Sequence, residues 1–297
     1  MMARKPLEGV FPLMPFVIKN NQEIDFEGLK ANLQFLNEAG VQGFIAFGCM
    51  GEFYAPSEEE FNKFVDVAVD SAGKLASVFG ATFQNTKESI RRAKYAEDAG
   101  ADGVMIASPY VINPTLEVAY EHYRLINEAV DEIQIMAYNY PPLTRGLNMT
   151  PEFWDKLLTL DRIKAVKESN TDIIHRCRLL YKIADKINVF SGGEGWFFPD
   201  GILGAKGIVS LFGMAVPKQV LALYKACRDK DIDKAVKLHK KFVEAQNLIT
   251  AENEVAFLKA TTELGGNKAG PPRAPYPPLD KETYEKLKRL LEEIKSL

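Results

Sequence analysis

The sequence predicts an α/β protein, namely a (β/α)8 TIM barrel with a C-terminal helical extension. Eight short apolar segments recur along the first 212 residues, and helix start signals lie in the gaps between them. Eight is the strand number of this barrel. An open sheet that binds a dinucleotide would carry Gly-x-Gly-x-x-Gly after its first strand, and this chain does not. We therefore expect residues 1–212 to form the barrel and residues 213–297 to pack on it as the extension.

The eight apolar segments have the composition of buried parallel strands. Each is rich in Val, Ile, Phe and Ala and is bounded by Gly or polar residues, as is typical of strands covered on both faces. Their spacing leaves room for one helix and two loops between successive strands. The expected strands are 9–16, 43–48, 77–82, 103–108, 134–139, 163–169, 187–192 and 207–212.

Residues that cap helices stand in the gaps between these strands. Each places a side-chain acceptor before an apolar-periodic stretch, in two cases with Glu three positions on and in two with Pro next. They are Asp25, Ser57 with Glu60, Asn85 with Glu88, Asn113 before Pro114, and Thr150 before Pro151. In the extension, 217–228, 231–249 and 281–297 have a helical pattern, whereas the Pro-rich stretch 265–278 does not.

Composition narrows the function classes. The 297 residues carry 37 Lys and Arg against 40 Asp and Glu, a net charge of −3, so we expect neither nucleic acid nor an anionic membrane as partner. No apolar run approaches the roughly 18 residues that span a bilayer. Three scattered Cys and three scattered His predict a reducing cytoplasmic location and no metal site.

Catalytic side chains of such a barrel belong at the carboxyl ends of its strands. This rule selects the segments 48–52, 108–110 and 192–194, together with Thr82, Tyr138, Asn139, Lys167 and Ser210. The same rule argues against a ligand site at the segment 204–207, Gly-Ala-Lys-Gly. This segment looks like a phosphate loop, but it leads into the eighth strand and so lies on the face opposite the carboxyl ends.

Lys167 is the most informative candidate. In a strand of period two, Ile163, Ala165 and Lys167 share one face. If that face points into the barrel, burial lowers the pKa of Lys167 and supplies the neutral amine that attacks a carbonyl. The alternatives are a surface lysine or a lysine paired with Glu168.

Four further features accompany Lys167 at the strand ends. Tyr138 is either a proton relay or an aromatic plug. The 48–51 turn is either an anion-binding nest of N–H groups or a purely steric Gly turn. Cys49 is expected to fill space rather than to act as a nucleophile, and Glu52 to fix its loop rather than to act as a base.

Four motifs resemble the dihydrodipicolinate synthase / N-acetylneuraminate lyase family in order and spacing. They are Gly-Cys-Met-Gly-Glu (48–52), Tyr-Asn-Tyr-Pro (138–141), Val-Lys-Glu (166–168) and Ser-Gly (191–192). The resemblance covers essentially the whole chain, including the Arg-Ala-Pro at 273–275. It implies a (β/α)8 barrel with C-terminal helices, a homotetramer, and a lysine Schiff base to the keto group of pyruvate or another 2-oxo acid, with no metal or diffusible cofactor.

Carried over residue by residue, the resemblance implies that Lys167 is the Schiff-base lysine and that Tyr138 shuttles protons. It implies that the 48–51 loop cradles the substrate carboxylate. Trp196 is either a substrate contact or a hydrophobic anchor. The substrate-binding residues expected at the strand ends are Gly48, Cys49, Met50, Gly51, Tyr110, Tyr140, Gly192, Glu194 and Ser210.

The motifs also depart from those of the dihydrodipicolinate synthases. Cys49 and Met50 replace two hydroxyl residues, which makes the pocket softer and less polar. The family's Pro-Tyr-Tyr reads Pro-Tyr-Val at 109–111, and its Arg after the Tyr-Asn-x-Pro motif is Leu143, with Arg145 two residues later. These departures argue against lysine biosynthesis, whereas Tyr140 is similar to 2-keto-3-deoxygluconate-type aldolases.

The leading hypothesis is a class I aldolase that makes or breaks a C–C bond to pyruvate or a related 2-oxo acid, with 2-keto-3-deoxy sugar acids as candidate substrates. One alternative is a 2-keto-3-deoxy sugar-acid dehydratase that uses the same lysine imine. Others are a dihydrodipicolinate synthase or N-acetylneuraminate lyase, and a non-catalytic barrel that binds 2-oxo acids.

Overall fold

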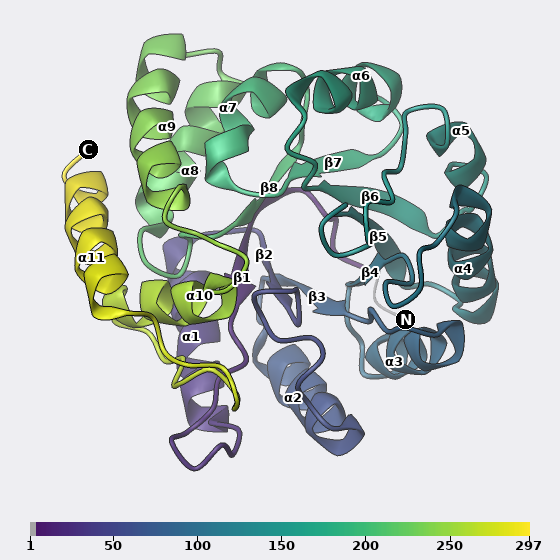
Figure 1. The fold of residues 1–297 in the computed structure, drawn as a ribbon, viewed down its shortest axis with the longest axis horizontal. Coiled ribbons are helices and arrows are strands. Elements are labelled where there is room, and N and C mark those ends of the chain that lie inside the picture. Colours follow the sequence, from purple (N-terminus) through teal and green to yellow (C-terminus); the bar gives the residue numbers. More distant parts are fainter. Residues whose placement is uncertain (1–3) are drawn as a thin grey trace.

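The strands of the computed structural model, which describes residues 4–297, close into a barrel in which every neighbouring pair is parallel and β1 pairs with β8 (Figure 1). The predicted (β/α)8 fold is therefore confirmed; residues 1–3 of the expected barrel segment lie outside the described residues. The strands are β1 (Gly9–Met14), β2 (Gly43–Ala46), β3 (Ala76–Gly80), β4 (Gly103–Ala107), β5 (Gln134–Asn139), β6 (Ile163–Glu168), β7 (Asn188–Ser191) and β8 (Gly207–Ser210).

Helices alternate with these strands and form an outer layer (Figure 1). They are α1 (Phe26–Ala39), α2 (Glu58–Ser71), α3 (Thr86–Asp98), α4 (Leu116–Ala129), α5 (Trp154–Leu157), α6 (Ile173–Ile183), α7 (Glu194–Ile202) and α8 (Pro217–Arg228). Because α8 packs against β1 and β8, it takes the place of the barrel's eighth helix. A boundary at residue 212 would therefore assign α8 to the extension, although it packs against the barrel strands β1 and β8.

Three of the five predicted caps are found as expected. Asp25 and Asn85 accept from the N–H groups of Gly28 and Glu88, and Ser57 forms the capping box with Glu60. The Asn-Pro and Thr-Pro pairs mark their helices too early. The side chain of Thr115, not Asn113, caps α4, and Pro151 lies in a turn before the short α5.

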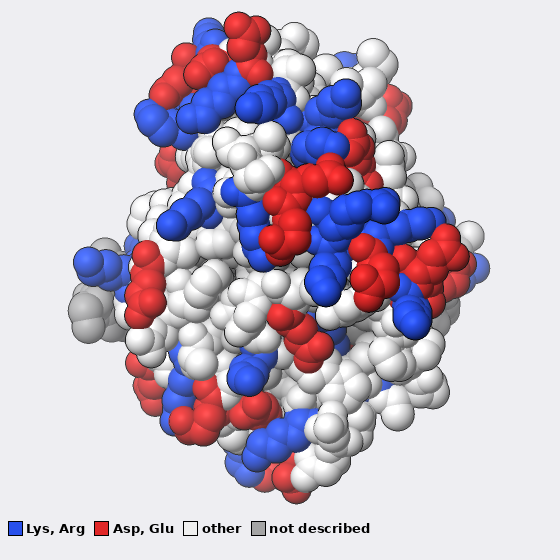
Figure 2. Space-filling view, turned by 90° about the vertical axis from the view of Figure 1, so that its left-hand side faces the viewer, with Lys and Arg blue, Asp and Glu red and all other residues white. Residues whose placement is uncertain are grey.

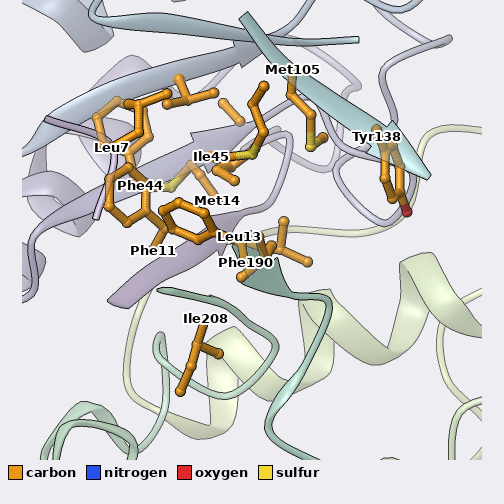
Figure 3. Close-up of a cluster of buried hydrophobic side chains, with 14 of the residues drawn as sticks. Leu7, Phe11, Leu13, Met14, Phe44, Ile45, Met105, Tyr138, Phe190 and Ile208 are labelled. Atoms are coloured by element: carbon orange, nitrogen blue, oxygen red, sulfur yellow. The ribbon is translucent and has the colours of Figure 1, made fainter. Parts of the chain in front are cut away.

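Large apolar side chains fill the barrel interior (Figure 3). The rings of Phe11 and Phe190 meet edge to face at 5.1 Å, and both are fully buried. Burying a side chain of this size contributes about 1.5–3 kcal/mol. Glycine begins β2 and β8, the two strands that flank β1, for a steric reason, since a Cβ at Gly43 would collide with Phe11 and one at Gly207 with Phe190. The Gly-bounded strands of the sequence thus make room for aromatic side chains.

The extension continues with α9 (Ile232–Gln246), α10 (Glu254–Leu264) and α11 (Lys281–Lys295). The helix α10 was not predicted. It lies between α11 and the barrel strands (Figure 1) and is buried over Val255–Thr262 on all sides. A helix covered all round carries no polar face, so its sequence lacks the amphipathic period by which helices are recognised.

The outer surface is mixed in charge on the side that carries α9 and α11. Lys, Arg, Asp and Glu side chains lie next to one another there, with uncharged surface between them (Figure 2). Within residues 4–297, every helix is too short or too polar to cross a bilayer.

Candidate active site

A cavity of about 510 Å³ opens at the carboxyl ends of the barrel strands. The loops after β2, β5, β6 and β7 line it, together with the segment that joins α9 to α10. Six of the predicted site residues are brought together in its wall: Cys49, Met50, Tyr138, Tyr140, Lys167 and Gly192. Trp196 lines the cavity as well. In the described part of the chain, no three His, Cys, Asp or Glu side chains are close enough together to hold a metal ion.

Lys167 projects into this cavity from β6 and is only 4% exposed. Lys164, on the opposite face of the strand, is exposed. Burial lowers the pKa of the Lys167 ammonium to about 8, against a smaller opposing effect of Cys49 and Glu254. The side chain is neither a surface lysine nor a partner of Glu168, because Glu168 bonds to Asn139 instead. A fraction of Lys167 is thus a neutral amine near pH 8.

Tyr138 stands beside Lys167 because the two residues are register partners on β5 and β6. The Lys167 Nζ lies 4.3 Å from the centroid of the Tyr138 ring. Burial, followed by the neighbouring Cys49 and Tyr140, raises the pKa of the Tyr138 phenol well above its usual value. Figure 3 shows the phenol at the carboxyl end of its strand, beyond the apolar cluster. Tyr138 therefore holds its proton in the free enzyme.

The loop after β2 leaves three backbone donors without a partner among residues 4–297. The N–H groups of Cys49, Met50 and Gly51 have no acceptor on another described residue, whereas those of Glu52 and Phe53 bond back to the carbonyls of Cys49 and Gly48. Cys49 and Met50 line the cavity. Burial raises the pKa of the Cys49 thiol to about 12, so the thiol is not an anion that would repel a carboxylate. The loop has the features of an anion-binding nest.

Glu52 holds this loop from behind and does not line the cavity. It is fully buried at a left-handed φ of 58°, and its carboxylate forms an ion pair with Lys259 at 3.0 Å. Lys259 also donates to the carbonyls of Phe16 and Pro271 at 2.7 Å each. The backbone N–H of Arg273 donates to Glu52 at 2.7 Å. Of the two roles considered for Glu52, the geometry supports loop fixing.

Several predicted substrate contacts lie outside the cavity wall. Glu194 and Ser210 bond to each other, and the Glu194 carboxylate also accepts from the N–H groups of Leu211 and Phe212. Their polar atoms are thus used in holding the end of β8. Tyr110 packs edge to face on Phe53.

Three other residues at the barrel mouth are also outside the cavity wall. Gly48 and Gly51 shape the loop after β2 without lining the cavity. The Arg145 side chain turns away and donates to Asn113 at 2.6 Å.

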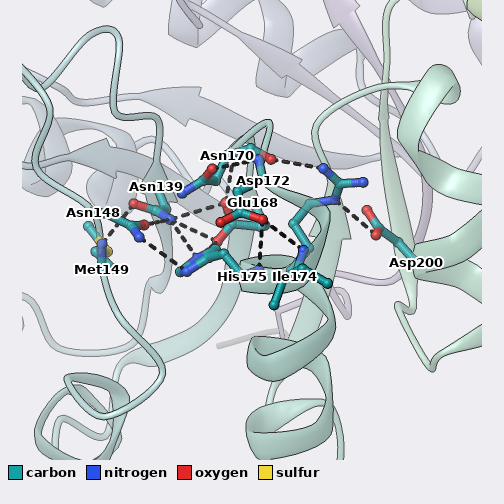
Figure 4. A network of polar contacts seen from close by, with 10 residues as sticks. Asn139, Asn148, Met149, Glu168, Asn170, Asp172, Ile174, His175 and Asp200 are labelled. Atoms are coloured by element: carbon teal, nitrogen blue, oxygen red, sulfur yellow. Dashed lines mark hydrogen bonds and ion pairs between the residues drawn. The ribbon is translucent and has the colours of Figure 1, made fainter.

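A buried polar network stands behind Tyr138 and Lys167 (Figure 4). The Asn139 amide donates to Glu168 at 2.9 Å and its oxygen accepts from the N–H of Met149 at 3.0 Å. Glu168 also accepts from the N–H of Asn170, and His175 contacts both Glu168 and Asn148. Since Asn139 and Glu168 directly follow Tyr138 and Lys167, the network fixes the ends of both strands.

Sequence reasoning missed the contribution of the extension to the cavity. Gln246, Thr250 and Glu254 line it, although they lie beyond the last strand. Burial raises the pKa of the Glu254 carboxyl, and Lys167 opposes that shift. The strand-end rule cannot find such residues, because they reach the barrel mouth from a helix pair that packs on its rim.

A lysine with a lowered pKa and a proton-holding tyrosine at the mouth of a parallel barrel define a class of enzyme. This class comprises the class I lyases, which break or form carbon–carbon or carbon–oxygen bonds through a lysine imine. The chain belongs to the dihydrodipicolinate synthetase family, whose model matches residues 6–294. Members of this family are lyases of the Schiff-base type, and this chain is one of them.

Known proteins resemble the chain over almost its full length. The 4-hydroxy-tetrahydrodipicolinate synthase of Methanothrix thermoacetophila is 31% identical over 97% of both chains. The dihydrodipicolinate synthase of Acinetobacter baumannii, solved in complex with pyruvate, is 26% identical with a TM-score of 0.90, over 98% of this chain and 100% of that one. A sialic acid aldolase of Ruminococcus gnavus, at 22% identity, shares the fold with a TM-score of 0.88 over 98% of each chain.

Proposed function

We propose that Lys167 forms an imine with the keto group of pyruvate or a related 2-oxo acid. The observation that carries this proposal is the buried Lys167 Nζ at 4.3 Å from the Tyr138 ring. The neutral amine attacks C2, and the keto oxygen leaves as water after it has gained two protons. The free N–H groups of the 48–51 loop hold the substrate carboxylate and so orient C2 towards Lys167.

The protonated imine then serves as the electron sink for the lyase step. As the C3–C4 bond breaks, its electron pair moves into the imine system, while the C4 hydroxyl gives up its proton and leaves as an aldehyde. Tyr138 is the acid–base group placed to move that proton. The positive charge of the imine beside the ring favours ionisation of the phenol, which holds its proton until the imine forms.

The substrate class we propose is a 2-keto-3-deoxy sugar acid, cleaved to pyruvate and an aldehyde or formed from them. Neutral polar groups on the wall support it, namely Tyr140, Ser169, Thr171, Gln246 and Thr250. Hydroxyl-rich substrates need such donors and acceptors. The dehydratase reaction on the same acids is the second candidate, because Glu254 adds a carboxyl near Lys167 that can protonate a leaving hydroxyl.

Reduction of the imine tests this proposal. The protein is incubated with pyruvate and borohydride, and the peptide that contains Lys167 is examined by mass spectrometry. We expect an adduct on Lys167 that is lost in Lys167→Ala and retained in Tyr138→Phe. Product analysis with 2-keto-3-deoxy acids then separates the two reactions, since an aldolase yields pyruvate and an aldehyde and a dehydratase a dehydrated 2-oxo acid. Failure of pyruvate and of a panel of 2-oxo acids to form the adduct would contradict the proposal.

The location and assembly of the protein are also proposals. We propose a cytoplasmic homo-oligomer, a tetramer by family resemblance. The exposed apolar side chains Val111 and Ile112, at 53% and 82% exposure, support a subunit contact near the loop before α4. Sedimentation velocity tests it, and a protein that stays monomeric at micromolar concentration would contradict it.

A further inference from the structure

Glu254 places a carboxylate in the wall of the catalytic cavity. It is the first residue of α10 and lines the cavity together with Lys167, Tyr138, Tyr140 and Cys49. Its charge acts on the pKa of each of these four groups. Within residues 4–297, Glu254 and Lys167 are the two charged side chains on this wall.

The Glu254 carboxylate is left without a bonded partner. No group in the described part of the chain donates a hydrogen bond to this carboxylate. Burial raises its pKa, and the charge of Lys167 opposes that shift. Lys167 lies beyond ion-pair distance of it, in contrast to Lys259, which pairs with Glu52 at 3.0 Å. A largely buried carboxylate that meets no donor within the protein is an acceptor ready for a donor on a ligand.

The rest of α10 holds this carboxylate in position. Five residues further along the helix, Lys259 is anchored to Glu52 and to the carbonyls of Phe16 and Pro271. The N-terminal end of a helix also favours a negative side chain. The anchored helix therefore keeps Glu254 at the cavity wall.

The charges on the wall limit what a bound 2-oxo acid can carry at its far end. Its own carboxylate and keto group occupy the 48–51 loop and Lys167. A second carboxylate further along the substrate would meet Glu254 and no cation on the wall, because the Arg145 side chain bonds to Asn113 outside the cavity. A hydroxyl at the same place would donate to Glu254.

We propose that Glu254 is a specificity-determining residue, which accepts a hydrogen bond from a neutral, hydroxylated substrate tail and excludes a tail that ends in a carboxylate. This inference rests on the proposed Lys167 imine. It predicts that the aldehyde partner of the lyase is a neutral hydroxyaldehyde, and that an aldehyde with its own carboxylate is a poor one. Like charges placed together in a cavity repel each other strongly enough to decide between such partners.

Imine trapping on paired 2-oxo acids tests the proposal without knowledge of the natural aldehyde. The pair is 2-oxoglutarate and 5-hydroxy-2-oxopentanoate, which differ in a carboxylate against a hydroxymethyl group at the far end. The concentration that gives half-maximal adduct is measured for each at pH 8, with pyruvate as the reference, in the wild type, in Glu254→Gln and in Glu252→Gln. Glu252 is the matched control, because it is exposed in the same segment and does not line the cavity.

We expect the wild type to prefer the hydroxymethyl acid by about tenfold or more, and Glu254→Gln to reduce that preference by about tenfold. Glu252→Gln should behave as the wild type does. An unchanged preference in Glu254→Gln, with pyruvate still trapped, would overturn this inference and leave the proposed function standing. Loss of trapping with every acid in the wild type would overturn the proposed function itself.

Addition of pyruvate to aldehydes supplies a second readout. Glyceraldehyde and tartronate semialdehyde differ in the same way, with a hydroxymethyl group in one and a carboxylate in the other. The ratio of their kcat/KM values should favour glyceraldehyde in the wild type and fall in Glu254→Gln. A ratio that does not move, or a wild type that prefers tartronate semialdehyde, would contradict the proposal.

Discussion

The Nζ of Lys167 lies 4.3 Å from the centre of the Tyr138 ring, on the neighbouring strand and in direct register with it. The pair combines a base with a lowered pKa and an acid with a raised one. Burial causes both shifts, because it disfavours the ammonium of Lys167 and the phenolate of Tyr138. The nucleophile and the proton carrier are thus prepared by the same desolvated site.

The lowered pKa of Lys167 predicts a pH dependence of imine formation. Below pH 8 the side chain is an ammonium, which is not nucleophilic, so the rate should rise about tenfold per pH unit and level off above about 8. The rate of trapping by cyanoborohydride with pyruvate measures this. Because the charge of Glu254 raises the pKa of Lys167, Glu254→Gln should move the midpoint down. A midpoint near the ordinary lysine value would contradict the assignment.

The same shift predicts that Lys167 lowers stability. The unfolded chain binds the lysine proton up to its ordinary pKa, whereas the folded chain releases it near 8, so this contribution to stability rises with pH between those values. Lys167→Met should raise the free energy of unfolding at pH 7, on the order of 3 kcal/mol. Urea denaturation at pH 7 and pH 10 measures it, and a gain that does not shrink at the higher pH would contradict the cause given.

Tyr138→Phe separates imine capture from turnover. The variant keeps the ring beside Lys167 but loses the hydroxyl, so turnover should fall by about 10²- to 10⁴-fold while the borohydride adduct still forms. Tyr140→Phe is the matched control, since its ring stacks on Tyr138 at 5.6 Å and the residue lies beyond the end of β5. Equal losses of turnover in both variants would show that the Tyr138 hydroxyl has no special role.

Lys259→Met tests how the 48–52 loop is held. Removal of the ammonium leaves the buried Glu52 carboxylate unpaired, which should cost about 3–5 kcal/mol of stability and raise the KM for pyruvate more than it lowers kcat. The Glu52→Gln/Lys259→Met double variant should recover part of the stability. Lys268→Met, an exposed lysine after α10, is the control. A double variant no more stable than the single one would argue against the pairing.

The barrel could be predicted because two signals in the sequence indicate its strands, namely the apolar runs and the glycines that bound them. Glycines such as Gly43 and Gly207 bound apolar runs, and the structure shows that each gives space to a phenylalanine of the barrel interior. The same periodic pattern placed Lys167 on the face that enters the cavity. Such local signals predict the folded structure correctly, since the strand period and the strand-end rule depend on the backbone alone.

The parts that escaped prediction depend on tertiary contacts. The helix α10 is buried on all sides and has no amphipathic period, so no local sequence pattern indicated a role for Glu254 or Lys259. Glu194 and Ser210 stand at strand ends as predicted, but they bond to each other and to the backbone after β8. Arg145 occupies a left-handed φ of 55°, and its side chain donates to Asn113 outside the cavity. Partners far away in the chain decide which strand-end residue meets a ligand and which one supports the loop.

The imine at Lys167 is tested by borohydride reduction with pyruvate, followed by mass spectrometry of the Lys167 peptide. We expect a pyruvate adduct at Lys167, its absence in Lys167→Ala, and its presence in Tyr138→Phe. An adduct on another lysine, or no adduct with any 2-oxo acid, would contradict this expectation.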